Sequence, residues 1–220
     1  MAIIARHIGK EIGTPATRVL TDISLEIKDG EFVALTGRSG SGKSTLLYLL
    51  SSLDTPSEGK IEISGRDLQG ISSEELYLFR NQEMGFVFQF HYLIAELTAV
   101  ENVLMPTVKQ GKKEQRRPAA EALLEQFDLK DKAHRLPRQL SGGEQQRVAI
   151  ARSLIMEPKY LFADEPTGSL DSVNGDIVMK IFSDVNSQKK TTVILVTHEP
   201  DFAQLAQRQI HLKDGRVQPH

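Results

Sequence analysis

An α/β fold is predicted for this chain by three features of its sequence. Two continuous apolar runs, YLFAD at 160–164 and TTVILVTH at 191–198, are typical of parallel strands covered on both faces. The apolar run FVALT at 32–36 is followed by a glycine-rich loop and then by leucines at helical spacing. Residues from about 90 to 157 have mostly helical patterns. We therefore expect an α/β core with an N-terminal antiparallel β subdomain and an inserted α-helical subdomain.

The remaining strands are predicted from alternation and turn residues. Val19 to Ile27 alternates between apolar and polar residues, and Asp29-Gly30 marks a turn before FVALT. KIEISG at 60–65 is a short strand that closes at a glycine, so the first third of the chain contains antiparallel hairpins. A last hairpin is expected around Asp214-Gly215.

Helices are predicted from capping patterns and periodicity. Ser72 and Glu75 have the spacing of a capping box and start a helix, which is followed by the buried strand GFVFQ at 85–89. RPAAEALLEQFDL at 117–129 is the clearest helical pattern of the insertion. A further helix is expected from Ser141 to Pro158.

Composition excludes several classes of function. The 27 basic and 29 acidic residues give a net charge of −2, so no general affinity for nucleic acid is expected. The densest basic patch, GKKEQRR at 111–117, fits a solvated loop and helix start better than a nucleic-acid site. Cysteine is absent, which excludes disulfides and thiolate metal sites. No apolar stretch approaches the ~20 residues of a membrane span, and residues 1–13 lack the features of a signal peptide. We expect a soluble intracellular protein that works at a membrane only through a partner.

The glycine-rich loop has the pattern of a phosphate-binding P-loop. It lies between a buried strand and an apolar helix, which is the context that such a loop requires. Glycines allow successive backbone N–H groups to surround phosphates, and the helix N-terminus adds partial positive charge. Lys43 is expected to reach the β- and γ-phosphates of a nucleotide, and the Ser44 hydroxyl to bind Mg²⁺. A glycine-rich turn with an accidental lysine is the weaker interpretation. The candidate nucleotide-binding residues here are Gly37, Arg38, Ser39, Gly40, Ser41, Gly42, Lys43, Ser44 and Thr45.

Four polar residues follow apolar strands and are expected at the same sheet edge as the loop. Asp164 and Glu165 end YLFADE, Gln89 follows GFVF, and His198 follows TTVILVT. Asp164 is the candidate Mg²⁺ ligand together with Ser44, and Glu165 is the candidate that orients or deprotonates the attacking water. Gln89 could contact Mg²⁺ or the water, and His198 the γ-phosphate. Each could be structural alone, but their common position favours catalysis.

The stretch LSGGEQQR at 140–147 indicates a second site for an anion. Ser141 and Glu144 could simply form a capping box. A cap does not need the two glycines that follow, Gly142 and Gly143, which each weaken a helix by ~1 kcal/mol relative to alanine. They suggest that something approaches the backbone closely. Because this stretch has no lysine and no metal-binding hydroxyl, we expect it to complete the nucleotide site of another molecule.

With these motifs in this order, the sequence resembles the nucleotide-binding subunits of ABC transporters over essentially its whole length. Gln89 matches the Q-loop, LSGGEQQR the signature, YLFADE the Walker B strand, GSLD at 168–171 the D-loop and His198 the switch histidine. The resemblance implies one ABC ATPase domain over residues 1–220. Its P-loop NTPase (RecA-like) core comprises 1–89 and 158–220, with the helical insertion at about 90–157. It also implies that ATP and Mg²⁺ are bound in a head-to-tail dimer, where Ser141, Gly142 and Gly143 of one copy hold the γ-phosphate bound to the other.

Within the family, the sequence is most similar to the lipoprotein-releasing (LolD-type) and macrolide-exporter (MacB-type) ATPases. LDTPSEGK at 53–60, LFRNQEMGFVFQFHYL at 78–93 and LTAVENVLMP at 97–106 carry this likeness. It implies a peripheral subunit at the cytoplasmic face of the bacterial inner membrane that drives lipoprotein release through integral membrane permeases, which contact the stretch after Gln89, including Phe90, Tyr92 and Leu93. A MacB-like peptide or drug exporter and an FtsE-type cell-division ATPase remain alternatives. A soluble ABC protein of DNA repair or translation is less favoured, because the chain holds neither a coiled-coil insertion nor a second ATPase domain.

One feature departs from the family pattern. The family has an aromatic residue near the N-terminus that stacks on adenine, but residues 1–31 contain no Phe, Tyr or Trp. The expected place lies around Lys10 to Ile12. The sequence therefore predicts phosphate binding without explaining how adenine is held.

Overall fold

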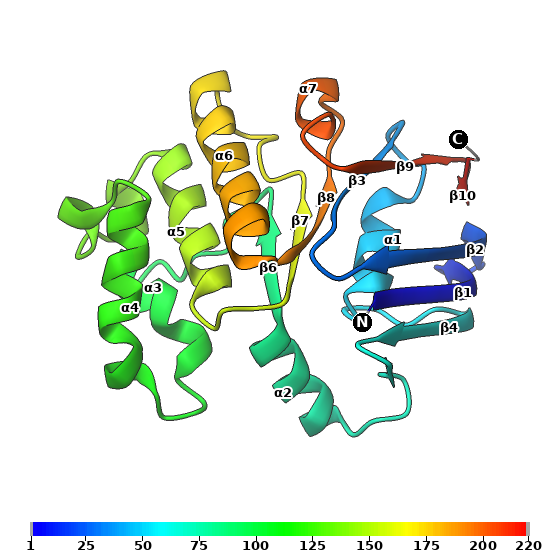
Figure 1. Ribbon diagram of the computed structural model, residues 1–220, viewed down its shortest axis with the longest axis horizontal. Coiled ribbons are helices and arrows are strands. Elements are labelled where there is room, and N and C mark those ends of the chain that lie inside the picture. Colours follow the sequence, from blue (N-terminus) through cyan, green and yellow to red (C-terminus); the bar gives the residue numbers. More distant parts are fainter. Residues whose placement is uncertain (1, 219–220) are drawn as a thin grey trace.

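The computed structural model describes residues 2–218 and confirms the predicted α/β class, with a central sheet between a group of helices and an antiparallel sheet (Figure 1). The strands of the central sheet follow the order β10-β9-β3-β8-β7-β6. They comprise β3 (Phe32–Gly37), β6 (Met84–Phe88), β7 (Tyr160–Asp164), β8 (Thr192–Val196), β9 (Arg208–Lys213) and β10 (Arg216–Val217). The second sheet has the order β2-β1-β4-β5 and comprises β1 (Ala2–Ile12), β2 (Thr17–Lys28), β4 (Glu58–Ile63) and β5 (Arg66–Asp67).

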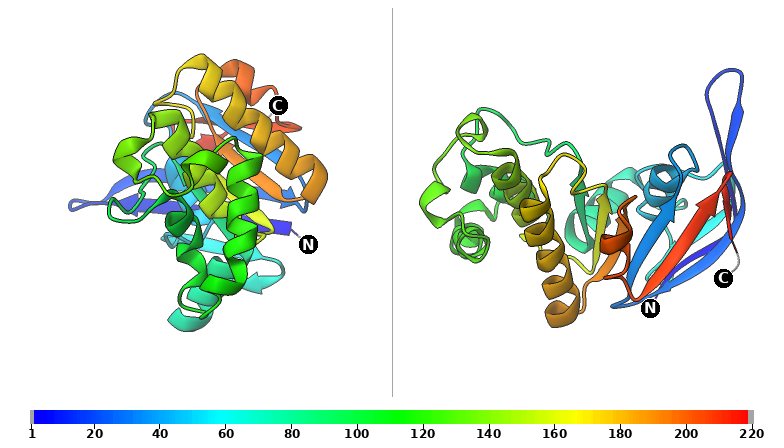
Figure 2. Two further views of the ribbon diagram at one scale, coloured as in Figure 1. Left: turned by 90° about the vertical axis from the view of Figure 1, so that its left-hand side faces the viewer. Right: turned by 90° about the horizontal axis from the view of Figure 1, so that it is seen from above.

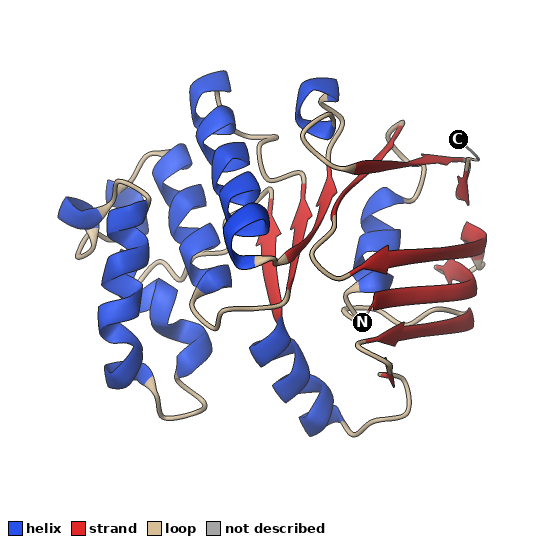
Figure 3. Ribbon diagram, viewed as in Figure 1, coloured by secondary structure: helices blue, strands red, loops and turns tan. Residues whose placement is uncertain are grey.

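Helices gather mainly on one side of the molecule and strands on the other (Figure 3). The helices are α1 (Lys43–Leu50), α2 (Ser73–Glu83), α3 (Ala99–Leu104), α4 (Lys113–Gln126), α5 (Gly142–Leu154), α6 (Ser172–Lys189) and α7 (Pro200–Ala203). Short 3₁₀ turns lie at Met105–Thr107, Lys130–Lys132 and Pro137–Gln139. The views in Figure 2 show α3, α4 and α5 at the end of the molecule away from the antiparallel sheet.

The central sheet is buried on both faces, as the apolar runs predicted. β3 pairs in parallel with β8 and β9, and β7 pairs in parallel with β6 and β8. Alternate residues of β7 join two different cores: Leu161 and Ala163 pack with α3 to α6, whereas Tyr160 and Phe162 pack with α1 and the antiparallel sheet. The two cores therefore lie on opposite faces of the central sheet.

The long strand β1 was not predicted from the sequence. It pairs with both β2 and β4, so it is the central strand of the antiparallel sheet. Its register shifts between Ala5 and Ile8, where His7 has a left-handed backbone (φ 50°). Ile3, Ala5 and Ile8 are buried, so the inward spacing changes from two residues to three, which removes the alternation that marks a strand in a sequence.

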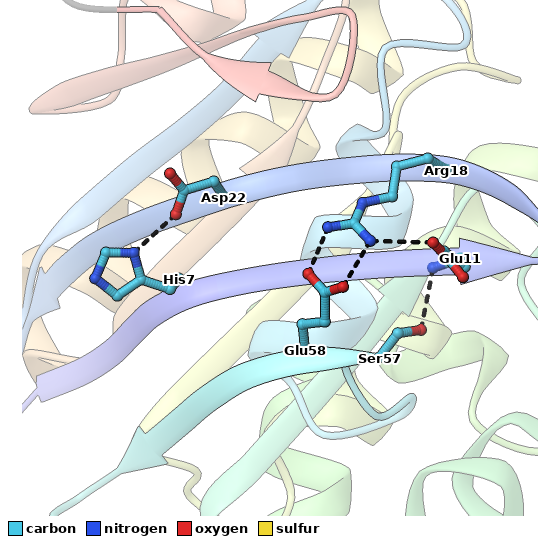
Figure 4. A network of polar contacts seen from close by, with 6 residues as sticks. All are labelled: His7, Glu11, Arg18, Asp22, Ser57 and Glu58. Atoms are coloured by element: carbon cyan, nitrogen blue, oxygen red, sulfur yellow. Dashed lines mark hydrogen bonds and ion pairs between the residues drawn. The ribbon is translucent and has the colours of Figure 1, made fainter.

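A polar network on the antiparallel sheet ties its hairpin together (Figure 4). Arg18 of β2 makes a two-pronged ion pair with Glu58 of β4 and also contacts Glu11 Oε1 of β1 at 3.0 Å. The backbone N–H of Glu11 donates to Ser57 Oγ at 3.1 Å, and His7 pairs with Asp22 farther along the sheet. These contacts fix the end of β1, where an adenine-stacking residue was expected.

Helix starts marked by a capping box were predicted correctly. The capping boxes of Ser72 with Glu75 and of Ser141 with Glu144 are both present. The helix predicted at 117–129 begins earlier, at Lys113, and the helix predicted to run to Pro158 ends at Leu154. Residues 91–97, predicted within a mostly helical region, contain no helix.

Candidate nucleotide-binding site

The glycine-rich loop joins β3 to α1, as its sequence predicted. Gly37 has φ +141°, and a Cβ there would lie 2.2 Å from the Leu212 carbonyl oxygen. Gly42 has φ +98°, and a Cβ there would lie 2.6 Å from Leu20 Cδ2. Only glycine fits both places, because each combines a left-handed backbone with a close neighbour. Gly40 has φ +77° with open space around it, and Arg38, Ser39 and Gly40 are exposed.

Lys43 folds back over this loop. Its Nζ donates to the carbonyl oxygens of Gly37 and Arg38, each at 3.0 Å, and the residue is only 6% exposed. A buried ammonium requires such oxygen partners. Ser41 and Thr45 flank it, and the Ser41 hydroxyl is buried without a partner among the described residues. The loop thus holds a buried cation against two of its own carbonyl oxygens.

Ser44 and Asp164 meet at the start of α1. Ser44 Oγ donates to Asp164 Oδ1 at 2.9 Å, and Asp164 is 9% exposed at the last position of β7. These hard oxygen atoms suit Mg²⁺, which uses one or two protein oxygens together with substrate phosphates and water. No cluster of three or more acidic, histidine or cysteine ligands occurs within residues 2–218, and a site completed by phosphates needs none. The residues therefore fit a magnesium ion.

Glu165 and Gln89 share one cavity with this pair. The open cavity has a volume of about 310 Å³, and its walls include Ser44, Gln89, Asp164 and Glu165. Glu165 has a left-handed backbone (φ 47°), uncommon for a residue with a side chain, and its N–H donates to Val196 O at 3.0 Å. The turn after β7 therefore places the Glu165 carboxylate beyond the strand end, beside the candidate metal ligands.

His198 lies next to Glu165 but outside the walls of the cavity. Its Nδ1 is 3.6 Å from Glu165 Oε2, which is too long for a hydrogen bond, and its side chain is 59% exposed. Gln89 rests on the turn after Glu165, where a Cβ at Gly168 would lie 3.0 Å from Gln89 Nε2. All four polar residues predicted at strand ends therefore lie at the edge of the sheet that carries the loop.

The second glycine stretch is on the opposite face of the sheet. α5 packs through Val148 and Leu154 into the core of the other helices, whereas α1 packs through Leu46 and Leu50 into the core of the antiparallel sheet. Figure 1 shows the two helices on either side of β7 and β8. Ser141 and the glycine loop of one chain thus face different sides, so they do not surround the same phosphate.

The two glycines of this stretch have different surroundings. A Cβ at Gly142 would meet nothing within 4 Å, which leaves room for an outside group. A Cβ at Gly143 would lie 2.2 Å from Asn174 Oδ1, so packing inside the chain accounts for that glycine. Ser141 Oγ accepts from the Glu144 N–H at 3.3 Å and caps its own helix. Gly142 therefore has open space beside it, whereas Gly143 is also required for packing against Asn174.

Comparison with known proteins agrees with this geometry. The ABC transporter family profile matches residues 20–168. The lipoprotein-releasing system ATP-binding protein LolD of Leptospira interrogans is 57% identical over 201 residues, or 91% of this chain and 85% of that protein. LolD of Aquifex aeolicus is 54% identical, over 90% of this chain and 89% of that protein. The chain belongs to the ABC transporter family.

Solved structures place this ABC chain among the ATPase subunits of the family. The dimeric ATP-binding cassette MJ0796, in a post-hydrolysis state bound to ADP and Pi, superposes with a TM-score of 0.90. The two sequences are 39% identical, and the match covers 99% of this chain and 97% of the cassette. The predicted likeness to LolD-type ABC ATPases is confirmed, and the chain is an ATPase subunit.

In this ABC subunit, α5 connects the surroundings of the cavity. The Gln146 amide is fully buried and donates to Pro166 O at 2.7 Å and to Phe88 O at 3.2 Å. Arg152 donates to the carbonyl oxygens of His91 at 2.7 Å and Tyr92 at 2.6 Å. Burial lowers the pKa of the Arg152 guanidinium. One helix thus holds the backbone on both sides of Gln89 and the turn after Glu165.

Reasoning from the sequence did not identify Tyr48 or these α5 residues as part of the site. Tyr48 lies one helical turn after Ser44, so helical spacing alone could have placed its side chain near the metal ligands. Gln146 and Arg152 give no such signal, because their partners are backbone oxygens 20 or more residues away in sequence.

Proposed function

We propose that the chain is the ATP-binding and hydrolysing subunit of a lipoprotein-releasing ABC transporter at the cytoplasmic face of a bacterial inner membrane. The convergence of Ser44, Gln89, Asp164 and Glu165 on one cavity beside the phosphate-binding loop carries the proposal of ATP hydrolysis. The names of the relatives from Leptospira interrogans and Aquifex aeolicus support lipoprotein release.

The loop residues bind the phosphates of ATP. Arriving phosphate oxygens replace the carbonyl oxygens that Lys43 now contacts, and the amides of residues 38–45 supply further donors. Ser44 and Asp164 hold Mg²⁺, which when bound neutralises charge on the β- and γ-phosphate oxygens. Because the loop opens to solvent at Arg38, Ser39 and Gly40, the nucleotide enters without rearrangement of the core.

Glu165 acts on the attacking water. Its carboxylate accepts a proton from the water as the water oxygen bonds to the γ-phosphorus and the bond to the bridging oxygen of ADP breaks. Gln89, which lines the same cavity, orients the water. His198, which lies beside Glu165 at the same sheet edge, is the proposed hydrogen-bond donor to the γ-phosphate.

A second copy of the chain completes each site. Ser141 and the exposed Gly142 lie on the other face of the sheet from their own phosphate-binding loop, so they are free to contact the γ-phosphate bound to a partner. The dimeric state of the cassette MJ0796 supports this arrangement. Two ATP molecules are then held between two copies in head-to-tail orientation.

Integral membrane permeases are the proposed partners of the segment after Gln89. Phe90 is 67% exposed and Tyr92 is 65% exposed, whereas Leu93 packs against the core. Within residues 2–218, the longest and most apolar helices fall short of what crossing a bilayer requires. The exposed aromatic side chains of Phe90 and Tyr92 provide apolar area for the permease partners.

Reconstitution tests the whole proposal. The chain is co-expressed with candidate permease subunits from the same genome, and the complex is inserted into liposomes that carry a lipidated outer-membrane protein. ATP should release the lipoprotein to an acceptor protein, and Glu165→Gln in the chain should prevent release. ATP hydrolysis that is stimulated by the permeases but insensitive to lipoprotein would point instead to an exporter or to a division ATPase.

A further inference from the structure

Tyr48 makes an unexpected contact with the candidate metal ligand Asp164. Its hydroxyl donates to Asp164 Oδ2 at 2.8 Å, while Ser44 Oγ donates to Asp164 Oδ1 at 2.9 Å. Both donors come from α1, one helical turn apart, and the acceptor ends β7. The two oxygens of one carboxylate are therefore each fixed by a separate side chain of the same helix.

The hydroxyl of Tyr48 contributes a hydrogen bond and is not needed for packing. A tyrosine side chain carries its phenolic O–H at physiological pH, so the Tyr48 hydroxyl has a proton to donate to Asp164. The ring of Tyr48 packs against the core that contains Leu46, Leu47 and Leu49. A phenylalanine ring would pack there equally well, so packing does not account for the hydroxyl.

We propose that Tyr48 is a positioning residue for Mg²⁺, which holds the Asp164 carboxylate in the orientation that presents Oδ1 beside Ser44. The inference rests on the proposed function, because it assumes that Mg-ATP occupies the cavity. A carboxylate held by only one donor can rotate, and ordering it on metal binding costs affinity. Partners that orient a ligand in this way contribute about 10–100-fold to metal affinity.

Tyr160 offers a matched control at the other end of the same strand. Its hydroxyl bonds to Ser64 Oγ at 2.8 Å and to Asp29 Oδ1 at 3.2 Å, far from the metal ligands at the end of β7. Tyr160→Phe removes a hydroxyl that makes two hydrogen bonds, and Tyr48→Phe removes a hydroxyl that makes one. Both changes affect stability, but only the change at Tyr48 should affect the response to Mg²⁺.

The test measures binding of the non-hydrolysable ATP analogue AMP-PNP by titration calorimetry at a series of Mg²⁺ concentrations and in EDTA. In EDTA the parental protein and both variants should bind alike. The Mg²⁺ concentration that gives half-maximal binding should rise about 10–100-fold in Tyr48→Phe and stay unchanged in Tyr160→Phe. Replacing Tyr48 with 4-aminophenylalanine, which keeps a donor at the same place, should restore the parental midpoint.

Each outcome decides the question. An unchanged Mg²⁺ midpoint in Tyr48→Phe, or the same increase in Tyr160→Phe, overturns the positioning role, and so does a 4-aminophenylalanine protein that behaves like Tyr48→Phe. A parental protein that binds no nucleotide with or without Mg²⁺ would instead overturn the proposed function. Melting temperatures of all variants show whether each is folded.

Discussion

Gly142 and Gly143 provide a matched pair of substitutions that tests whether two chains share each ATP site. We predict that Gly142→Asp leaves the monomer intact but prevents the ATP-driven dimer. A Cβ at Gly142 meets nothing within 4 Å, so the chain itself tolerates a side chain there. An acidic residue in the first turn of α5 also interacts favourably with the helix dipole, by ~0.3–1 kcal/mol. The monomer should therefore be no less stable than the parent.

The effect on the dimer is large because the new carboxylate would face phosphate. Two unit negative charges about 5 Å apart repel by roughly 3 kcal/mol at an effective dielectric constant of about 20. A head-to-tail dimer contains two such sites, so the penalty is about 6 kcal/mol. That corresponds to a decrease on the order of 10⁴-fold in the dimerisation constant.

The assay uses Glu165→Gln as background, so that ATP is not consumed. Sedimentation with Mg-ATP should show a stable dimer for Glu165→Gln and a monomer for the protein that also carries Gly142→Asp, with ATP binding to the monomer retained. Gly143→Ala should behave differently, because its methyl group collides with Asn174 and should destabilise the fold by ~1–3 kcal/mol. A stable ATP dimer of the Gly142→Asp double variant would refute the shared site.

Three further predictions follow from the site. Glu165→Gln should slow ATP hydrolysis by roughly 10²–10⁴-fold, the contribution of a positioned general base, while an ATP-binding titration shows unchanged affinity; rapid turnover would exclude Glu165 as the base. ATP and GTP should bind within about tenfold of each other in competition experiments, because Ile12 provides an exposed aliphatic side chain but no aromatic face for the base, and a base–aromatic stack is worth ~1–3 kcal/mol; a strong preference for ATP would contradict this. Phe90→Asp should abolish co-purification with the permease subunits but leave the melting temperature unchanged, because Phe90 is exposed. Leu93→Asp should lower the melting temperature, because Leu93 packs against the core. If the Phe90→Asp protein still co-purifies with the permeases, the contact lies elsewhere.

Features with local causes could be predicted from the sequence. The phosphate-binding loop needs glycines and a strand–loop–helix context, and all of these lie within one short stretch. The capping boxes at Ser72 and Ser141 involve residues three apart, so their spacing was sufficient. The polar residues at strand ends, such as Asp164, were found because parallel strands bring their carboxyl ends to one edge.

Features held by distant contacts could not be predicted. Residues 91–97 form no helix, because the Asn102 side chain satisfies part of their backbone hydrogen bonding. Its amide donates to Ile94 O and Leu97 O, and its Oδ1 accepts from the Ile94 N–H. The end of α5 depends on Glu157, whose left-handed backbone (φ 55°) stops the helix without a glycine. Gly143 leaves room for the side chain of Asn174, which comes from another helix. Asn102 and Asn174 are not adjacent in sequence to the residues they contact, and the residue type of Glu157 does not indicate a left-handed backbone.

The contacts of α5 have a mechanical consequence. Arg152 lies near one end of the helix and donates hydrogen bonds to the carbonyl oxygens of His91 and Tyr92 in the exposed aromatic segment. Gly142 lies at the other end of the helix. The ten residue steps from Gly142 to Arg152 correspond to about 15 Å of continuous helix, which is stiff along its axis. Gln146 lies between these two ends of the helix, and its amide donates hydrogen bonds to the backbone next to Gln89 and next to Glu165. We expect force applied to the aromatic segment to be transmitted along α5 to the Ser141–Gly143 end.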